Sequence, residues 1–126
     1  MKKYVWTALS FFWAGLIFYL SFVKPTDLEG VPSFDHQDKL GHFIFYAAFG
    51  WMMAKSLAQE ISVTRPIAKA ALLAFAYGGL VELGQFYFTT DREGSFLDAL
   101  ANGLGIVSTV GLIKTFPKWF LFYVKN

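Results

Sequence analysis

The chain contains no cysteine, and this excludes disulfide bonds, thiolate metal sites and a cysteine nucleophile. Charged residues are also scarce: they make up 16% of the chain, whereas a soluble domain carries roughly 25%. So few charges cannot cover a water-facing surface of ordinary composition. Because 56% of the residues are hydrophobic, the composition predicts a protein whose solvent is the bilayer. We expect membrane lipids as partners, and no nucleic acid.

Four apolar segments follow one another along the chain, at residues 4–23, 40–58, 70–90 and 96–113. About 20 apolar residues cross a bilayer as an α-helix. The sequence therefore predicts an all-α bundle of four transmembrane helices in a single domain, residues 1–126. A short C-terminal segment of mixed aromatic residues and lysines is expected to lie at the membrane interface.

The first apolar segment follows Lys2 and Lys3, so a cleaved signal peptide is the alternative to a membrane anchor. We favour an uncleaved anchor for two reasons. The apolar run is longer than a typical signal-peptide core, and bulky residues from Leu20 to Val23 replace a small-x-small cleavage site.

The distribution of lysine and arginine predicts the orientation of the helices. With the N-terminus inside, eight of the eleven basic residues lie on the inner side and three on the outer side. Cytoplasmic loops carry an excess of basic residues. Both termini are therefore expected on the cytoplasmic side of the membrane.

Polar residues interrupt three of the four predicted spans, and each pair of them shares one helix face: Asp38 with His42, Glu82 with Gln85, and Asp98 with Asn102. An ionisable side chain within a span costs on the order of 2.5–3.5 kcal/mol. In the predicted topology all three pairs fall in the outer half of the membrane. Small residues such as Gly78 and Gly105 accompany them and are typical of helix contact faces. We therefore expect three helices to direct polar pairs into one outward-facing pocket.

These residue types suit acid–base chemistry on a lipid headgroup. The candidate catalytic residues are His42 as general base or nucleophile, Asp38 as the group that orients it, Glu82 as the acid, and Asp98. The candidate substrate-binding residues are Lys39, Arg92, Gln85 and Asn102, with the two cations on a phosphate. A divalent cation such as Mg²⁺, if one is bound, would be held by Asp98 and Glu82.

Each of these residues also has a purely structural interpretation. His42 can be an interfacial, hydrogen-bonded histidine, and Tyr46, one turn further, more often packs than reaches such a site. Glu82 can be a protonated carboxyl that links helices, although such bonds average only about 0.6 kcal/mol. Asp98 can cap its helix, and the side chains of Lys39 and Arg92 can extend to lipid headgroups.

The ordered polar residues resemble the VanZ-like family of bacterial membrane proteins. The matching pieces are Asp38-Lys39-Leu40-Gly41-His42, Glu82-Leu83-Gly84-Gln85, Arg92, and the run from Asp98 to Gly105. The resemblance implies a multi-pass protein of the bacterial plasma membrane, and so of the cell envelope. The founding member is linked to low-level resistance to the glycopeptide teicoplanin, and the family has no agreed biochemical activity.

Three functions remain open at this point. The first is an enzyme acting on a polyprenyl-phosphate-linked cell-wall precursor at the outer leaflet. The second is a protein that binds, shields or presents such a precursor, or a glycopeptide, without chemistry. The third is a small proton-coupled transporter that uses Glu82 and His42 as a relay.

Overall fold

The structure is a computed structural model, and it describes residues 3–22, 37–88 and 96–119. The described chain forms four α-helices: α1 (Val5–Phe22), α2 (Gln37–Lys55), α3 (Pro66–Phe88) and α4 (Phe96–Thr115). A π-helical turn, η2 (Ser56–Glu60), directly continues α2. The described residues contain no strand, so the predicted all-α architecture is confirmed for them.

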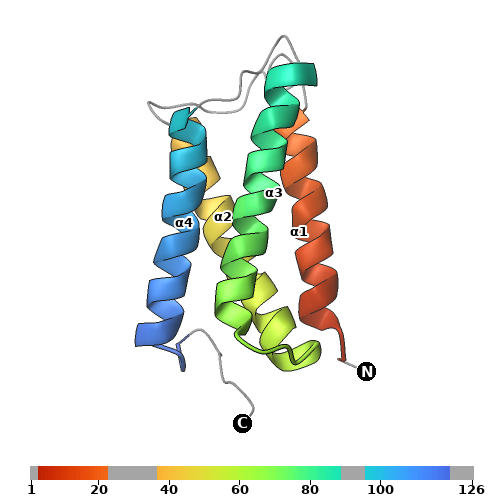
Figure 1. Cartoon of the computed structure of the whole chain (residues 1–126), viewed down its shortest axis with the longest axis vertical. Helices are drawn as coiled ribbons and strands as arrows, with labels where there is room; N and C mark the ends of the chain where they lie inside the picture. The colour runs from red at the N-terminus through yellow and green to blue at the C-terminus, as the bar shows by residue number, and fades with distance from the viewer. Residues whose placement is uncertain (1–2, 23–36, 89–95, 120–126) are drawn as a thin grey trace.

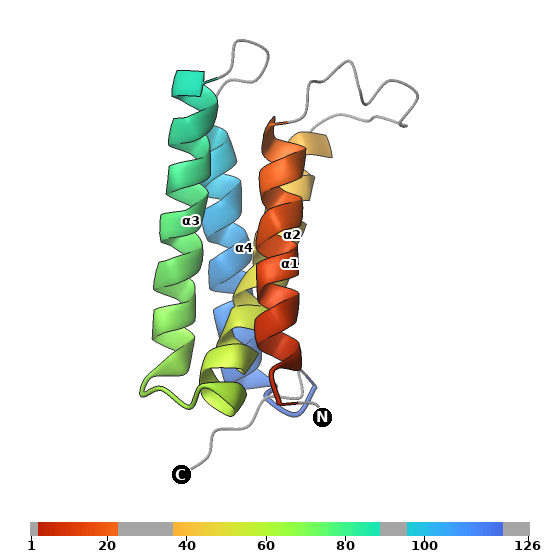
Figure 2. The same cartoon turned by 90° about the vertical axis from the view of Figure 1, so that its right-hand side faces the viewer.

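The four helices run alternately up and down, and the first turn of α1, η2 and the last turn of α4 lie at the same end of the bundle (Figures 1 and 2). Helix α2 contacts α1, α3 and α4, and its contact with α4 is the most extensive in the molecule. The order of the helices therefore places the start of α2, the end of α3 and the start of α4 together at the opposite end.

Three helical segments are long and apolar enough to cross a membrane: Val5–Phe22, Pro66–Phe88 and Leu97–Thr115. They correspond to the first, third and fourth predicted spans and support a multi-pass membrane protein. Many large apolar side chains on them are exposed, among them Phe11, Leu72 and Phe86, as expected of surfaces that face lipid. The predicted second span falls on α2 and η2.

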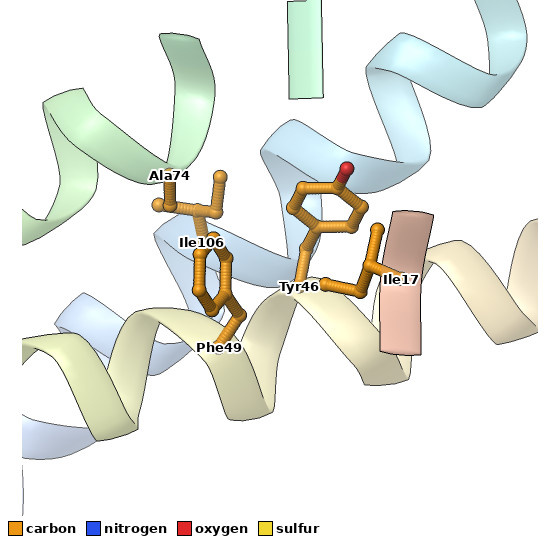
Figure 3. Close-up of a cluster of buried hydrophobic side chains, with 5 residues drawn as sticks. All are labelled: Ile17, Tyr46, Phe49, Ala74 and Ile106. Carbon is orange, nitrogen blue, oxygen red and sulfur yellow. The ribbon is translucent and has the colours of Figure 1, made fainter. Parts of the chain in front are cut away.

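One apolar cluster in the interior draws on all four helices (Figure 3). Its members are Ile17 of α1, Tyr46 and Phe49 of α2, Ala74 of α3 and Ile106 of α4. Side chains that contribute to one packed cluster fix the rotation of each helix about its own axis. The polar faces one or two turns away are thereby also fixed relative to one another.

Helices α2 and α4 approach each other closely at Gly105, as the small residues in the sequence predict. A Cβ atom on Gly105 would collide with the backbone carbonyl oxygen of Phe43 and would lie 3.1 Å from the backbone nitrogen of Ala47. One turn further, the Thr109 hydroxyl donates a hydrogen bond to the Ala47 carbonyl oxygen at 2.6 Å. This close contact brings the beginning of α4 against the beginning of α2.

The π-helical turn carries a carboxylate that caps a different helix. Glu60 accepts hydrogen bonds from the backbone N–H groups of Trp6 and Thr7, both at 2.7 Å, and from the Thr7 hydroxyl at 2.8 Å. The first N–H groups of any helix have no partner within that helix, and an anion is favoured beside them. Glu60 therefore fastens the first turn of α1, which has no acidic residue of its own, to the end of α2.

Replacing Glu60 by glutamine is expected to lower the free energy of unfolding by about 1–3 kcal/mol, the usual effect of losing hydrogen bonds to a charged group. The amide has one acceptor oxygen where the carboxylate has two, so one of the N–H groups of α1 loses its partner. The change is measured by unfolding the purified protein in detergent with increasing concentrations of a denaturant. The control is Thr64→Ala, which alters an exposed polar residue outside the four helices, and equal stability of the two variants would contradict this role.

Candidate functional site

Polar side chains from three helices meet at the end of the bundle opposite to η2. His42 lies near the start of α2, Glu82 in the second half of α3, and Asp98 in the first turn of α4. One ring nitrogen of His42 and one carboxylate oxygen each of Glu82 and Asp98 lie within 4.8 Å of one another. We call the group formed by Lys39, His42, Glu82, Asp98 and Asn102 the polar cluster. The convergence that the helical spacing predicts is therefore present in the fold.

Asn102 orients the imidazole ring of His42. The Nδ1 atom of His42 lies 2.7 Å from the amide oxygen Oδ1 of Asn102. An amide oxygen only accepts hydrogen bonds, so Nδ1 carries the proton and donates it. In the neutral ring the lone pair then belongs to Nε2, and Nε2 lies 3.7 Å from Oδ2 of Asp98. His42 thus presents a basic nitrogen to the two carboxylates.

Asp98 joins two members of the polar cluster through its two oxygens. Its Oδ1 forms a 2.8 Å ion pair with Nζ of Lys39, while Oδ2 faces the His42 ring. Asp98 is only 8% exposed although it belongs to the first turn of α4. A carboxylate there is favoured by the N-terminus of the helix. Its partners nevertheless lie on α2, so Asp98 does more than cap its own helix.

Glu82 and Gln85 share the inward face of α3, and both are buried. Glu82 is 8% exposed as a residue, and its carboxyl group lies near His42 and Asp98 in the cluster. Gln85 donates from Nε2 to the backbone carbonyl oxygen of Ser21 at 2.8 Å. The amide of Gln85, expected to bind substrate, is therefore used at least in part to hold α3 against α1.

Tyr46 is a member of this region that the sequence indicated only weakly. Its side chain is 1% exposed, its ring lies nearly parallel to that of His42 with centroids 6.5 Å apart, and Glu82 is close enough for its charge to act on the hydroxyl. Among the described residues, the Tyr46 hydroxyl and Nδ2 of Asn102 are buried polar atoms with no hydrogen-bond partner. The i,i+4 spacing from His42 is the signal that identifies Tyr46.

Gly78 makes room for both of these groups. A Cβ atom on Gly78 would lie 3.1 Å from Cε1 of Tyr46 and 3.2 Å from Nδ2 of Asn102. The face of α3 one turn from Glu82 is thus open enough for an aromatic ring and an amide to lie against its backbone. This agrees with the sequence prediction that small residues accompany the polar face of the third span.

Two predicted site residues cannot be placed. Arg92 and the side chain of Asp38 lie outside the described residues. In the described part of the site, Asn102 takes the orienting role that sequence analysis assigned to Asp38. The predicted contribution of Asp38 and the predicted phosphate contact of Arg92 stay predictions.

Comparisons of the chain with protein-family models, with curated proteins and with solved structures found no match. The structure itself defines the class: an all-α protein with several helices suited to a membrane, and a buried polar cluster at one end of the bundle. The VanZ-like resemblance rests on the ordered motif residues alone.

Proposed function

We propose that the chain is a VanZ-like, multi-pass protein of the bacterial plasma membrane that binds a lipid-linked phosphate in the polar cluster and acts on its headgroup. The supporting observation is the meeting of a base, two carboxylates and an ammonium group from three helices in a bundle that otherwise faces lipid. Ionisable groups within membrane helices are expensive and are generally functional.

In this proposal α2 also crosses the membrane, which gives four transmembrane helices. Both termini are then cytoplasmic, as the basic residues of the sequence predict. Asp98 is two residues from the start of α4 and Glu82 is six residues from the end of α3. At 1.5 Å per residue these positions lie roughly 3 and 9 Å below the helix ends. The polar cluster then lies at the depth of the outer-leaflet headgroups, where a polyprenyl-phosphate-linked cell-wall precursor presents its phosphate.

Four members of the polar cluster, together with Arg92, have a role in this proposal. Lys39 and Arg92 bind the phosphate oxygens. The lone pair on Nε2 of His42, held in position by Asn102, activates the attacking water. Glu82 is the acid that protonates the departing oxygen.

A non-catalytic protein that shields or presents a precursor, or a glycopeptide such as teicoplanin, is the second candidate. The hydrogen bonds of His42 to Asn102 and of Gln85 to α1 favour it, because they hold the cluster rigid before any ligand arrives.

A proton-coupled transporter has less support. The apolar cluster around Tyr46, Phe49 and Ile106 separates the polar cluster from the buried Lys55 and from Glu60 at the other end.

The test is an assay of the purified protein in lipid nanodiscs with undecaprenyl phosphate, undecaprenyl diphosphate and a diphosphate-linked sugar precursor. We expect saturable binding of the phosphorylated lipids, none of undecaprenol, and release of a water-soluble headgroup from at least one of them. Binding without release would favour the second candidate. If phosphorylated lipids bind no better than undecaprenol, the proposed function is wrong.

Glu82→Gln separates catalysis from binding. Glutamine keeps the size of the side chain and can still form hydrogen bonds, but it cannot donate a proton to a leaving group. We expect headgroup release to fall about 10²–10⁴-fold, the usual contribution of a general acid, while the phosphorylated lipid still binds saturably. Release that survives the substitution would rule out Glu82 as the acid.

A further inference from the structure

The charge of the polar cluster is poorly matched to an anionic ligand. With both carboxyls ionised and His42 neutral, the described cluster holds two negative charges, on Glu82 and Asp98, and one positive charge, on Lys39. Like charges repel strongly where water is largely excluded. A phosphate group would add to this repulsion. Arg92, which we propose binds the phosphate, lies outside the described residues, and a further positive charge within the cluster would favour phosphate binding.

Three groups of the polar cluster, those of His42, Glu82 and Asp98, are ligand types that bind a divalent metal ion. Nε2 of His42 carries a lone pair, and Oδ2 of Asp98 lies 3.7 Å away. Two ligands on one metal ion, each at about 2.1 Å, are separated by up to about 4.2 Å. The ligand atoms of His42, Glu82 and Asp98 lie within 4.8 Å of one another, so a side-chain shift of about 1 Å closes the site.

The surroundings of these three groups match those of a metal site. A metal-binding histidine usually donates its second ring N–H to an oxygen that fixes the tautomer, and Asn102 accepts that bond at 2.7 Å. Lys39 holds Oδ1 of Asp98 and thereby turns Oδ2 toward His42.

An independent sign of an additional ligand comes from two neighbouring atoms. The Tyr46 hydroxyl and Nδ2 of Asn102 belong to side chains that are 1% and 3% exposed, and neither atom has a hydrogen-bond partner among the described residues. Both side chains lie against Gly78, one turn from Glu82. A water molecule or an anion bound to a metal ion would satisfy these donors.

We infer that His42, Glu82 and Asp98 bind one divalent transition-metal ion of the Zn²⁺ type. An imidazole ligand suits such an ion, whereas Mg²⁺, Ca²⁺ and Mn²⁺ prefer carboxylate, carbonyl and water oxygens. This inference deepens the proposed function and rests on it for the role of the ion. A bound divalent cation would change the net charge of the described cluster from one negative to one positive, and it would supply a Lewis acid for a phosphate oxygen and for water. With the ion bound, Nε2 of His42 and the Glu82 carboxylate would be its ligands, so the ion would take over the activation of water and the stabilisation of the departing oxygen.

Cobalt(II) is the probe for this site, because its visible absorption reports nitrogen and oxygen ligands directly. The full chain, purified through a tag without histidine and stripped with EDTA, is titrated with Co²⁺. Zn²⁺, Mn²⁺ and Mg²⁺ are then added as competitors. We expect one Co²⁺ per chain, displaced by Zn²⁺ and not by an equal concentration of Mg²⁺. His42→Ala and Asp98→Asn should abolish the signal. Glu60→Gln, which changes a carboxylate at the other end of the bundle, should leave the stoichiometry unchanged.

Asn102 provides a test that does not depend on removing a ligand. Asn102→Leu removes the acceptor for Nδ1 and is expected to weaken Co²⁺ binding 10–100-fold, the usual loss when such a supporting residue is changed. Asn102→Asp keeps an acceptor oxygen and should restore the affinity. Circular dichroism of each variant shows whether the helices are intact.

The inference is wrong if the intact protein gives no Co²⁺ absorption band, or if His42→Ala binds Co²⁺ as tightly as the unchanged chain. Either outcome would leave a shared proton as the charge that balances the two carboxylates. These measurements read metal binding without any lipid, so they separate a failure of the metal site from a failure of the proposed lipid function.

Discussion

Replacing His42 by alanine is expected to reduce headgroup release from a polyprenyl-phosphate-linked lipid by at least about 10²-fold, the lower end of what a positioned base or water-activating group contributes. The ring nitrogen Nε2 is directed at the carboxylates because Asn102 holds Nδ1, and alanine offers no substitute. Initial rates in nanodiscs of fixed lipid composition measure the effect. Binding of the phosphorylated lipid is measured in parallel, so that a loss of rate is not mistaken for a loss of affinity.

His36→Ala is the matched control, since it removes the other histidine of the chain. We expect this variant to keep its rate. A His42→Ala protein that is folded and retains more than about half of the original rate would exclude His42 from the chemistry, and the polar cluster would then be better described as a binding site.

Replacing Gly105 by alanine is expected to cause a large loss of stability, although the residue lies outside the polar cluster. The added Cβ would meet the backbone of Phe43 and Ala47, and a backbone cannot move aside as the end of a flexible side chain can. Overpacking of this kind costs about 1–3 kcal/mol. The loss is measured by reversible unfolding in mixed detergent. Gly105→Val should lower the free energy of unfolding more than Gly105→Ala does.

Gly111→Ala tests whether the effect comes from the contact or from the residue type. Gly111 lies in the same helix, and a Cβ there would meet nothing within 4 Å. Alanine favours the helix over glycine by about 0.5–1 kcal/mol, so this variant should be unchanged or slightly more stable. Equal losses at the two positions would show that α2 and α4 are not as close as the structure has them.

The length and the periodicity of the apolar runs were sufficient to predict the four helices and the faces that carry the polar pairs. The sequence could identify the face of α4 that holds Asp98 and Asn102. Because hydrophobic burial is not directional, it could not determine which residue of α2 each of them meets. The pairing of Asp98 with Lys39 and of Asn102 with His42 depends on how far the helices are rotated and shifted along each other. That relation is set by Gly105 and by the apolar cluster.

The contacts of Glu60 could not be predicted from the sequence, and the reason is different. The sequence indicated that residue 59 begins a loop, whereas the helical course continues through Glu60 as a π-helical turn. The wider turn brings this carboxylate to the first N–H groups of α1, 53 and 54 positions earlier in the chain. Local sequence patterns cannot indicate a hydrogen-bond acceptor that lies so far away along the chain.

The bond between Glu60 and the first turn of α1 also has a consequence for biosynthesis. Translation proceeds from the N-terminus, so the residues of α1 are made before their capping carboxylate exists. Until residue 60 has been synthesised, the first N–H groups of α1 lack the partner that η2 later supplies. The cap on α1 therefore forms only after the whole of α2 has been made.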